Sequence, residues 1–154
     1  METYSVHFGF SQHFDFPPEQ AFLWCTDYAP GDLELMGEKG RRKVKRLNED
    51  TFILNDKYKT KEGKLVKKKL VRVYPERLSW TNTRVSKDGR HSQFLYQIVT
   101  EEGGSSRLEF TGSQIFSGKK PGKAKLEAMA RQLAIEDSAA WRSLAKAMAK
   151  DLSK

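Results

Sequence analysis

Residues 126–148 read LEAMARQLAIEDSAAWRSLAKAM, a stretch in which apolar side chains return at the period of an α-helix. We expect one long amphipathic helix from Lys123 to Leu152. Asp137 falls in the middle of its apolar seam, which holds a charge where a plain core helix would not. The seam itself consists of Leu126, Met129, Ala130, Leu133, Ala140, Trp141, Leu144 and Met148.

A carboxylate in such a seam needs a partner or water, because moving an unpaired charge into a dry core is costly. Asp137 lies one helical turn from Leu133 on one side and from Trp141 on the other. Two interpretations stay open. Asp137 either closes a structural pair with a strand residue such as Arg84 or Tyr96, or it borders a partly wet ligand cavity beneath the helix.

The chain before this helix alternates like a series of strands joined by short turns, among them Lys87-Asp88-Gly89. Short helices are expected after the first strand, because Pro17 and Pro18 suit a helix start after a capping Asp15, and Pro30 breaks the helical pattern. The expected strands are 3–14, 41–48, 51–60, 64–74, 77–86, 91–101 and 105–117.

One strand, two short helices, six more strands and a long C-terminal helix predict an α+β fold. A curved antiparallel sheet of seven strands can wrap around the helix, and the gap between them becomes a cavity. With 154 residues, of which 38% are hydrophobic, the chain has the size of one domain with a real core. We expect a single domain over residues 1–154.

Two further stretches carry a resemblance to a known superfamily. Residues 14–28, FDFPPEQAFLWCTDY, run from a strand into a proline-started helix that ends near Asp27, and residues 73–80, VYPERLSW, form a mid-sheet turn. Both are similar to the START-domain and birch-pollen-allergen superfamily, called SRPBCC, which includes polyketide cyclase-like proteins. The resemblance covers essentially the whole chain and implies the helix-grip fold. It leaves the function open, because members include lipid carriers, metabolite binders, cyclases and chaperone-associated domains.

Alternation along the strands predicts which side chains line the cavity. If Trp80 points inward, every second residue on its strand and the matching rows on the neighbouring strands share its face. Aromatic walls with a few polar groups suit a flat, largely apolar molecule, although the same aromatic residues could simply fill the core. The weaker candidates are Asp56 and Tyr58. The candidate ligand-binding residues are Trp80, Asn82, Arg84, Phe94, Tyr96, Phe110, Asp137 and Trp141.

The net charge is +8, from 28 Lys and Arg against 20 Asp and Glu. Positive residues gather in the strands predicted between residues 41 and 69, and we expect them to form a solvated face that keeps the protein dispersed. Aromatic residues are not interleaved with them as single-strand stacking requires, so nucleic acid is not the expected partner. The residues placed on this solvated face are Arg42, Lys45, Lys57, Lys67 and Lys69.

Motifs for chemistry are missing from the sequence. The three histidines and one cysteine have no metal-ligand spacing, and there is no nucleophile elbow or dinucleotide fingerprint. Cys25 lies in an apolar setting where a thiol is usually inert packing. We therefore expect no metal, no cofactor and no catalytic residue. The N-terminus has no secretory pattern and no apolar run is long enough to span a bilayer, which predicts a cytoplasmic protein.

Three functions remain after these exclusions. The favoured one is binding, with transport as an extension, of a hydrophobic small molecule or lipid in the cavity. The alternative is an aromatase or cyclase acting on a polyketide-like substrate in the same cavity. The weaker alternative is a protein or nucleic-acid interaction domain that uses the basic sheet face. The sequence leaves open whether any reaction is catalysed and whether the chain forms a homodimer.

Overall fold

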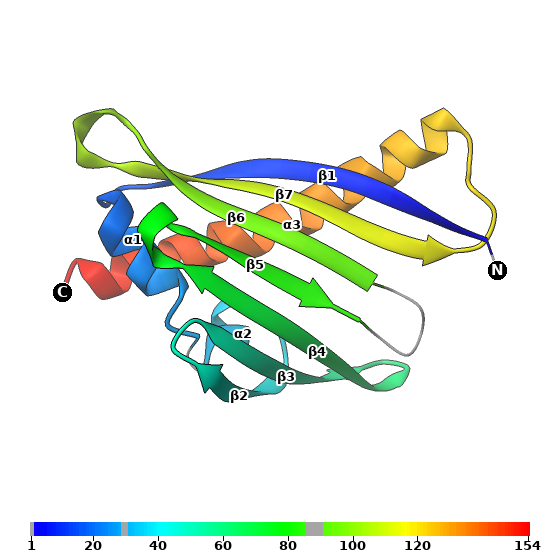
Figure 1. The fold of residues 1–154 in the computed structure, drawn as a ribbon, viewed down its shortest axis with the longest axis horizontal. Coiled ribbons are helices and arrows are strands. Elements are labelled where there is room, and N and C mark those ends of the chain that lie inside the picture. Colours follow the sequence, from blue (N-terminus) through cyan, green and yellow to red (C-terminus); the bar gives the residue numbers. More distant parts are fainter. Residues whose placement is uncertain (1, 29–30, 86–90) are drawn as a thin grey trace.

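A computed structural model describes residues 2–28, 31–85 and 91–154 (Figure 1). Strand β1 (Thr3–Phe14) leads into the short helices α1 (Pro18–Cys25) and α2 (Asp32–Leu35). The long helix α3 (Lys123–Leu152) ends the chain. Between α2 and α3 lie β2 (Gly40–Asn48), β3 (Thr51–Thr60), β4 (Gly63–Tyr74), β5 (Ser79–Arg84), β6 (His91–Thr100) and β7 (Ser106–Ser117).

The seven strands form one antiparallel sheet in the order β1-β7-β6-β5-β4-β3-β2. The predicted α+β helix-grip arrangement, with two short helices after the first strand, is confirmed. The strand expected at 77–86 begins later, at Ser79, because Pro75–Arg77 form a single 3-10 turn and Leu78 has a left-handed φ of 49°. Residue 86 and the predicted turn Lys87-Asp88-Gly89 lie outside the described residues.

The start of α1 differs from the expectation of an Asp15 cap. The helix begins three residues later at Pro18, and Pro17 occupies the cap position without a side-chain hydrogen bond. The Asp15 carboxylate instead lies 2.8 Å from Nε2 of His13. Pro18 needs no capping partner of its own because it has no backbone N–H.

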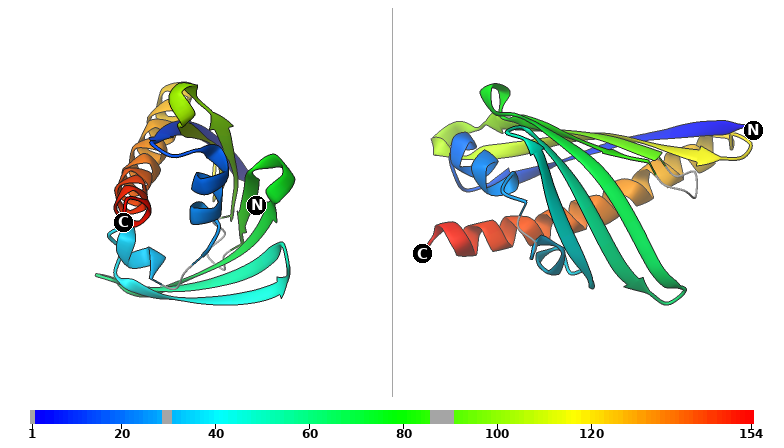
Figure 2. Two further views of the ribbon diagram at one scale, coloured as in Figure 1. Left: turned by 90° about the vertical axis from the view of Figure 1, so that its left-hand side faces the viewer. Right: turned by 60° about the horizontal axis from the view of Figure 1, so that its bottom comes forward.

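The sheet is strongly curved, and α3 lies across its concave side (Figure 2). Strands β2 to β4 swing away from the plane of β1 and β7, while α3 packs along β1. Helix α1 packs against β6 and β7, and α2 contacts both β2 and α3. The two short helices therefore fill one end of the space between sheet and long helix.

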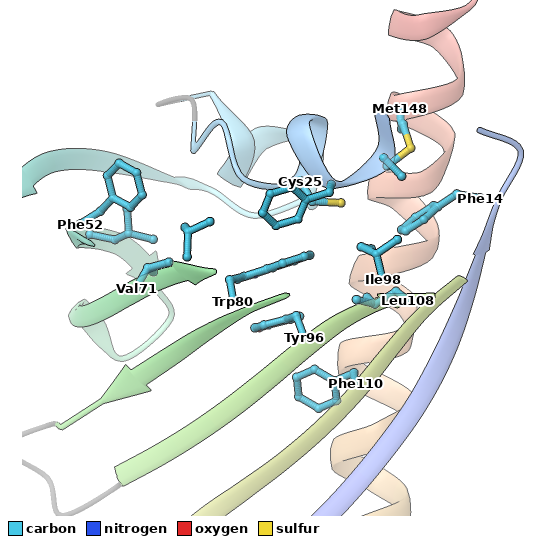
Figure 3. Packing of buried hydrophobic residues seen from close by; sticks show 14 of the residues in the cluster. Phe14, Cys25, Phe52, Val71, Trp80, Tyr96, Ile98, Leu108, Phe110 and Met148 are labelled. Carbon is cyan, nitrogen blue, oxygen red and sulfur yellow. The ribbon is translucent and has the colours of Figure 1, made fainter. Parts of the chain in front are cut away.

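Aromatic packing holds that end together (Figure 3). The Trp80 side chain is 1% exposed and stacks on Tyr96 with ring centroids 4.9 Å apart and planes at 4°. Phe22 of α1 and Trp141 of α3 contact the same indole at centroid distances of 5.9 and 6.4 Å. This single cluster joins α1, the sheet and α3, and each buried aromatic side chain stabilises the fold by roughly 1.5–3 kcal/mol.

Gly112 on β7 permits the rings of the neighbouring strands to meet. A Cβ atom at this position would lie 2.8 Å from a ring carbon of Phe94 and 2.9 Å from ring carbons of Phe110. These two rings pack with centroids 5.1 Å apart. Any side chain at Gly112 would push these rings apart, so only the smallest residue fits between them.

In the described ranges, no helix combines the length and the apolar character needed to cross a membrane.

Candidate functional site between the sheet and the long helix

A cavity of about 360 Å³ lies between the concave sheet face and α3. This volume is within the range of small-molecule sites, about 300–1,000 Å³. Strands β3 to β7 form one wall, α3 forms the other, and Met36 and Glu38 after α2 border it. The structure brings together, on this lining, six of the eight residues predicted from the sequence, namely Asn82, Arg84, Phe94, Tyr96, Asp137 and Trp141.

The other two predicted residues lie elsewhere. Trp80 lines a smaller space of about 80 Å³ next to α1, which shares Tyr96 and Trp141 as walls with the larger cavity. Phe110 is 2% exposed and belongs to the hydrophobic core, lining neither of these two spaces. Both residues sit behind the cavity wall, where they support Tyr96.

Asp56 of β3 is the most completely paired charge of the described structure. Its side chain is 0% exposed and accepts hydrogen bonds of 2.8 and 2.9 Å from Nε and Nη2 of Arg42. Nζ of Lys69 donates at 2.9 Å and the Tyr58 hydroxyl at 3.2 Å. Burial acts to raise the pKa of Asp56, but the Arg42 hydrogen bonds and the charges of Lys69 and Arg42 outweigh it and hold the pKa below the usual value.

This cluster corrects the prediction of one solvated basic face. Arg42 and Lys69 have side chains only 6% and 15% exposed, and Lys67 borders the cavity, so all three point inward. The reason is the alternation of side chains along β4. Lys67, Lys69 and Val71 are two residues apart, so their side chains lie on the same face of the sheet, and Val71 on that face is fully buried. Lys45 and Lys57 are exposed, as predicted.

Asp137 contrasts with Asp56. It lines the cavity from α3, and no hydrogen bond or ion pair joins its carboxylate to any residue that the structure describes. Burial raises the pKa of Asp137 to about 6, opposed chiefly by the charge of Lys67. The interpretation that Asp137 borders a cavity therefore fits the geometry, whereas a direct pair with Arg84 or Tyr96 is not formed.

Lys67 faces the cavity from the opposite wall. Its ammonium nitrogen sits 4.9 Å from the centre of the Tyr58 ring and makes no hydrogen bond or ion pair within residues 2–28, 31–85 and 91–154. Burial lowers the pKa of Lys67 and the nearby charge of Arg84 lowers it further, while Glu38 and Asp137 act in the opposite direction. The cavity lining therefore carries cations on the sheet side and carboxylates on the helix side. The cations are Lys67, Lys69 and Arg84, and the carboxylates are Glu136 and Asp137, with Glu38 after α2.

The remaining lining is mixed. Ser92, Gln114 and Asn82 place a hydroxyl and two amides on the sheet wall, and Phe116 extends the aromatic surface. Sequence reasoning missed Lys67, Ser92, Gln114 and Phe116 as lining residues. The strand alternation contains the signal for all four, because each lies an even number of residues from a buried side chain of its own strand and so shares the face of that side chain. Met36 and Glu38 follow α2 in irregular backbone, where no periodic pattern exists.

Metal-ligating side chains do not converge in this structure. Across the described ranges, no group of three or more His, Cys, Asp or Glu side chains is placed to hold a metal ion. Cys25 is buried, and burial raises its pKa well above the ordinary value, which keeps it a protonated thiol.

The fold matches several solved structures closely. A protein from Thermus thermophilus superposes with a TM-score of 0.76, at 12% identity over 94% of this chain and 98% of that one. The aromatase/cyclase Zhui from a Streptomyces species gives 0.72, at 7% identity over 97% and 96% of the chains. A norcoclaurine synthase point mutant from Thalictrum, in complex with a transition-state analogue, gives 0.73 at 10% identity over 98% of both chains.

The chain has the helix-grip fold of the SRPBCC superfamily. The resemblance predicted from residues 14–28 and 73–80 is thereby confirmed at the level of structure. No protein-family model matches the sequence, and no curated protein matches it either. At these identities the helix-grip match shows architecture alone, so the chemistry must be argued from the cavity.

Proposed function

We propose that this helix-grip protein binds a small molecule with an aromatic or otherwise apolar body and polar groups, in the cavity between the sheet and α3. The observation that carries the proposal is the pair of Asp137 and Lys67, two ionisable groups that line the cavity without a protein hydrogen bond or ion pair among the described residues. A group built only for packing would be apolar or paired. Transport of the same molecule is an extension that needs no further residue.

The apolar part of the lining supports the same function. Tyr96, Phe94 and Trp141 present ring surface to the cavity, and stacked or edge contacts with them suit a flat molecule. The structural matches to an aromatase/cyclase and to a norcoclaurine synthase are consistent with a small-molecule site in this fold. Because the wall is polar as well as aromatic, the ligand is expected to be amphipathic and not a plain hydrocarbon.

Native mass spectrometry of protein purified from its own source is the direct test. The expected result is a defined mass adduct of one small molecule per chain, released on denaturation. A variant that fills the cavity, Ala140→Trp, should lose the adduct, because Ala140 lines the cavity from α3. Its matched control is Ala139→Trp, since Ala139 is the preceding helix residue and is exposed.

The mass adducts of wild type and the two variants distinguish a ligand in the cavity from one bound elsewhere. An adduct present in wild type and Ala139→Trp but missing from Ala140→Trp supports the cavity as the site. An adduct that persists in a folded Ala140→Trp variant places the ligand elsewhere and contradicts the proposal. Circular dichroism of each variant establishes that it is folded.

A second candidate function is catalysis of the aromatase or cyclase type. The observation that favours it is Asp137, whose pKa of about 6 lies near neutrality and suits proton transfer. The Tyr96 hydroxyl, whose pKa is raised by burial, and the Lys67 ammonium line the same cavity as proton donors. The cavity could fold a reactive poly-β-keto chain and move a proton between carbon and oxygen.

A synthetic poly-β-keto thioester tests this second function. Catalysed cyclisation followed by loss of water would appear as a cyclised product in liquid chromatography with mass spectrometry, and Asp137→Asn should abolish it because the amide cannot accept the proton. Product formation at the same rate in wild type, Asp137→Asn and buffer would leave binding as the function.

A further inference from the structure

The sheet wall of the cavity changes from polar to aromatic along its length. Residues paired across adjacent antiparallel strands form cross-strand rows, and successive rows on one face are two residues apart. The second row on the concave face holds Asn82 and Phe94 beside Gly112. The third row is Trp80, Tyr96 and Phe110. The first row, whose members all line the cavity, is Lys69, Arg84, Ser92 and Gln114.

The aromatic row closes the cavity at the end near α1. Next to it lies the smaller space of about 80 Å³, which is lined chiefly by apolar side chains, among them Cys25 and Leu144. Met36, Tyr96 and Trp141 line both spaces. These three side chains therefore form the partition between the two spaces, with Tyr96 contributed by the sheet and Trp141 by α3.

The Tyr96 ring is held by other rings on both sides (Figure 3). Trp80 stacks on it from β5, and Phe110 of β7 packs against it with ring centroids 5.1 Å apart and planes at 63°. Trp141 contacts both Tyr96 and Trp80, at centroid distances of 5.6 and 6.4 Å. Close-packed rings move only when their neighbours move as well, so Tyr96 and Trp141 form a fixed stop. Met36 is the flexible member of the partition.

Two measures of the distance from the polar row to this stop agree. At about 3.3 Å per strand residue, Ser92 and Tyr96 on β6 lie about 13 Å apart. At about 1.5 Å per helix residue, Leu133 and Trp141, the first and last cavity-lining residues of α3, lie about 12 Å apart along the helix axis. The cavity therefore accommodates a molecule about as long as a ring system with a short chain.

We propose that Tyr96 and Trp141 determine the length of ligand that the cavity accepts. The ligand is an elongated amphipathic molecule with its polar end at the row of Ser92 and Gln114 and its apolar end against the two rings. Polar atoms placed against the rings would lose water without gaining a hydrogen bond, which favours this orientation. The inference rests on the proposed function and specifies the orientation and the size of its ligand.

A homologous series of neutral 4-alkylphenols, from 4-methylphenol to 4-nonylphenol, tests the length limit. Displacement of the fluorescent dye N-phenyl-1-naphthylamine gives the affinity of each member. In wild type the affinity should rise about fourfold per methylene while the chain fills the cavity, and should stop rising at a break within the series. A rise that continues through the whole series would overturn the inference without any variant.

Variants then locate the stop. Trp141→Ala joins the two spaces, so the break should move to longer chains by about two methylenes or more, because loss of the indole leaves room for them. Trp141→Phe should give a smaller shift. Leu133→Ala is the matched control, because Leu133 lines only the larger cavity, from the same helix. Its break should stay at the wild-type chain length, whatever the change in affinity.

The double variant Trp141→Ala with Leu144→Trp returns an indole to the smaller space, which Leu144 lines without touching the larger cavity. The break should return toward the wild-type chain length, an effect that general loosening of the fold would not produce. Circular dichroism establishes that each variant is folded. An unchanged break in folded Trp141→Ala, or a break that stays long in the folded double variant, would overturn the inference.

The cavity-filling variant separates this inference from the proposed function. Loss of alkylphenol binding in Ala140→Trp places the series in the cavity, as both proposals require. If the series binds there and its affinity shows no break, the length limit is wrong and the binding function stands. Binding that Ala140→Trp leaves unchanged, or no binding of any member, contradicts both proposals.

Discussion

Two aspartates on the concave side of the same fold have opposite surroundings. Asp56 is 0% exposed and is saturated by Arg42, Lys69 and Tyr58, whereas Asp137 borders a cavity and has no such partner among the described residues. The pKa of Asp56 is held below its usual value and that of Asp137 is raised to about 6. The difference teaches that a buried carboxylate within the sheet is given partners by its neighbours, whereas the carboxylate on the helix side lines a cavity without one.

The two ends of the space under α3 differ in the same way. The end closed by α1 and α2 is filled by Trp80, Phe22 and the rings around them. The end near Asp137 has polar side chains and a volume of about 360 Å³. A filled end gives stability, and an open, polar end gives room for function at some cost in stability.

The largest effect is expected at the paired carboxylate. Asp56→Leu leaves two cations buried without their counter-charge, and removal of one partner of a buried ion pair costs about 3–5 kcal/mol of unfolding free energy. Urea denaturation measures this loss. The control is Lys57→Leu, the next residue, which is exposed and should change stability by less than about 0.5 kcal/mol. A loss of less than about 1 kcal/mol in the Asp56→Leu variant would show that the paired Asp56 carboxylate does not stabilise the fold, and would contradict its contrast with Asp137.

Asp137→Leu is expected to act in the opposite direction. With a folded pKa of about 6 against an ordinary 3.8, ionisation of Asp137 disfavours the folded state as the pH rises through this interval. At 1.36 kcal/mol per pKa unit the penalty above pH 6 is at most about 3 kcal/mol, and solvent in the cavity reduces it. The variant should therefore equal or exceed wild type at pH 8, with its advantage shrinking toward pH 4.

The control for this variant is Glu136→Leu, because Glu136 is the preceding, exposed residue and borders the same cavity at its rim. Its stability should stay within about 0.5 kcal/mol of wild type. Asp137→Leu should also lower the occupancy of the co-purifying molecule. Unchanged stability together with unchanged occupancy would mean that Asp137 is simply solvated, and the cavity argument would fail.

The smallest effects are expected on the outer face of the sheet. Lys45→Gln and Lys57→Gln remove exposed charges and should change stability by less than about 0.5 kcal/mol. Binding of wild type to duplex DNA or anionic vesicles should be weak and should vanish at physiological salt, through counterion release and screening. Submicromolar binding that persists at that salt would favour an interaction domain over a cavity protein.

The fold was predictable from sequence because its periodic signals are long. The seam around Leu133, Trp141 and Met148 and the alternation of seven strands predicted the element order, and the stretch at residues 73–80 placed the mid-sheet turn. The strand start at Ser79 was missed because a single 3-10 turn and the left-handed Leu78 are local geometry that alternation does not encode.

The site was predictable only in part. Strand alternation alone placed Asn82, Phe94 and Tyr96 on the concave face, but the lysines of the basic strands were expected to point outward. Lys67 and Lys69 break that rule because a buried carboxylate and a polar cavity lie beneath them. Whether a lysine faces in or out depends on what the neighbouring strands bring, and that information is tertiary.

One nuclear magnetic resonance titration tests the comparison directly. The side-chain carboxyl carbons of Asp56 and Asp137, followed by ¹³C chemical shift in the same isotope-labelled sample, report both protonation equilibria. The account predicts a midpoint below 3.8 for Asp56 and a midpoint near pH 6 for Asp137. An Asp137 midpoint at or below 3.8 would show that its carboxylate is paired or fully solvated. It would contradict the placement of an unpaired, partly buried carboxylate on the cavity wall.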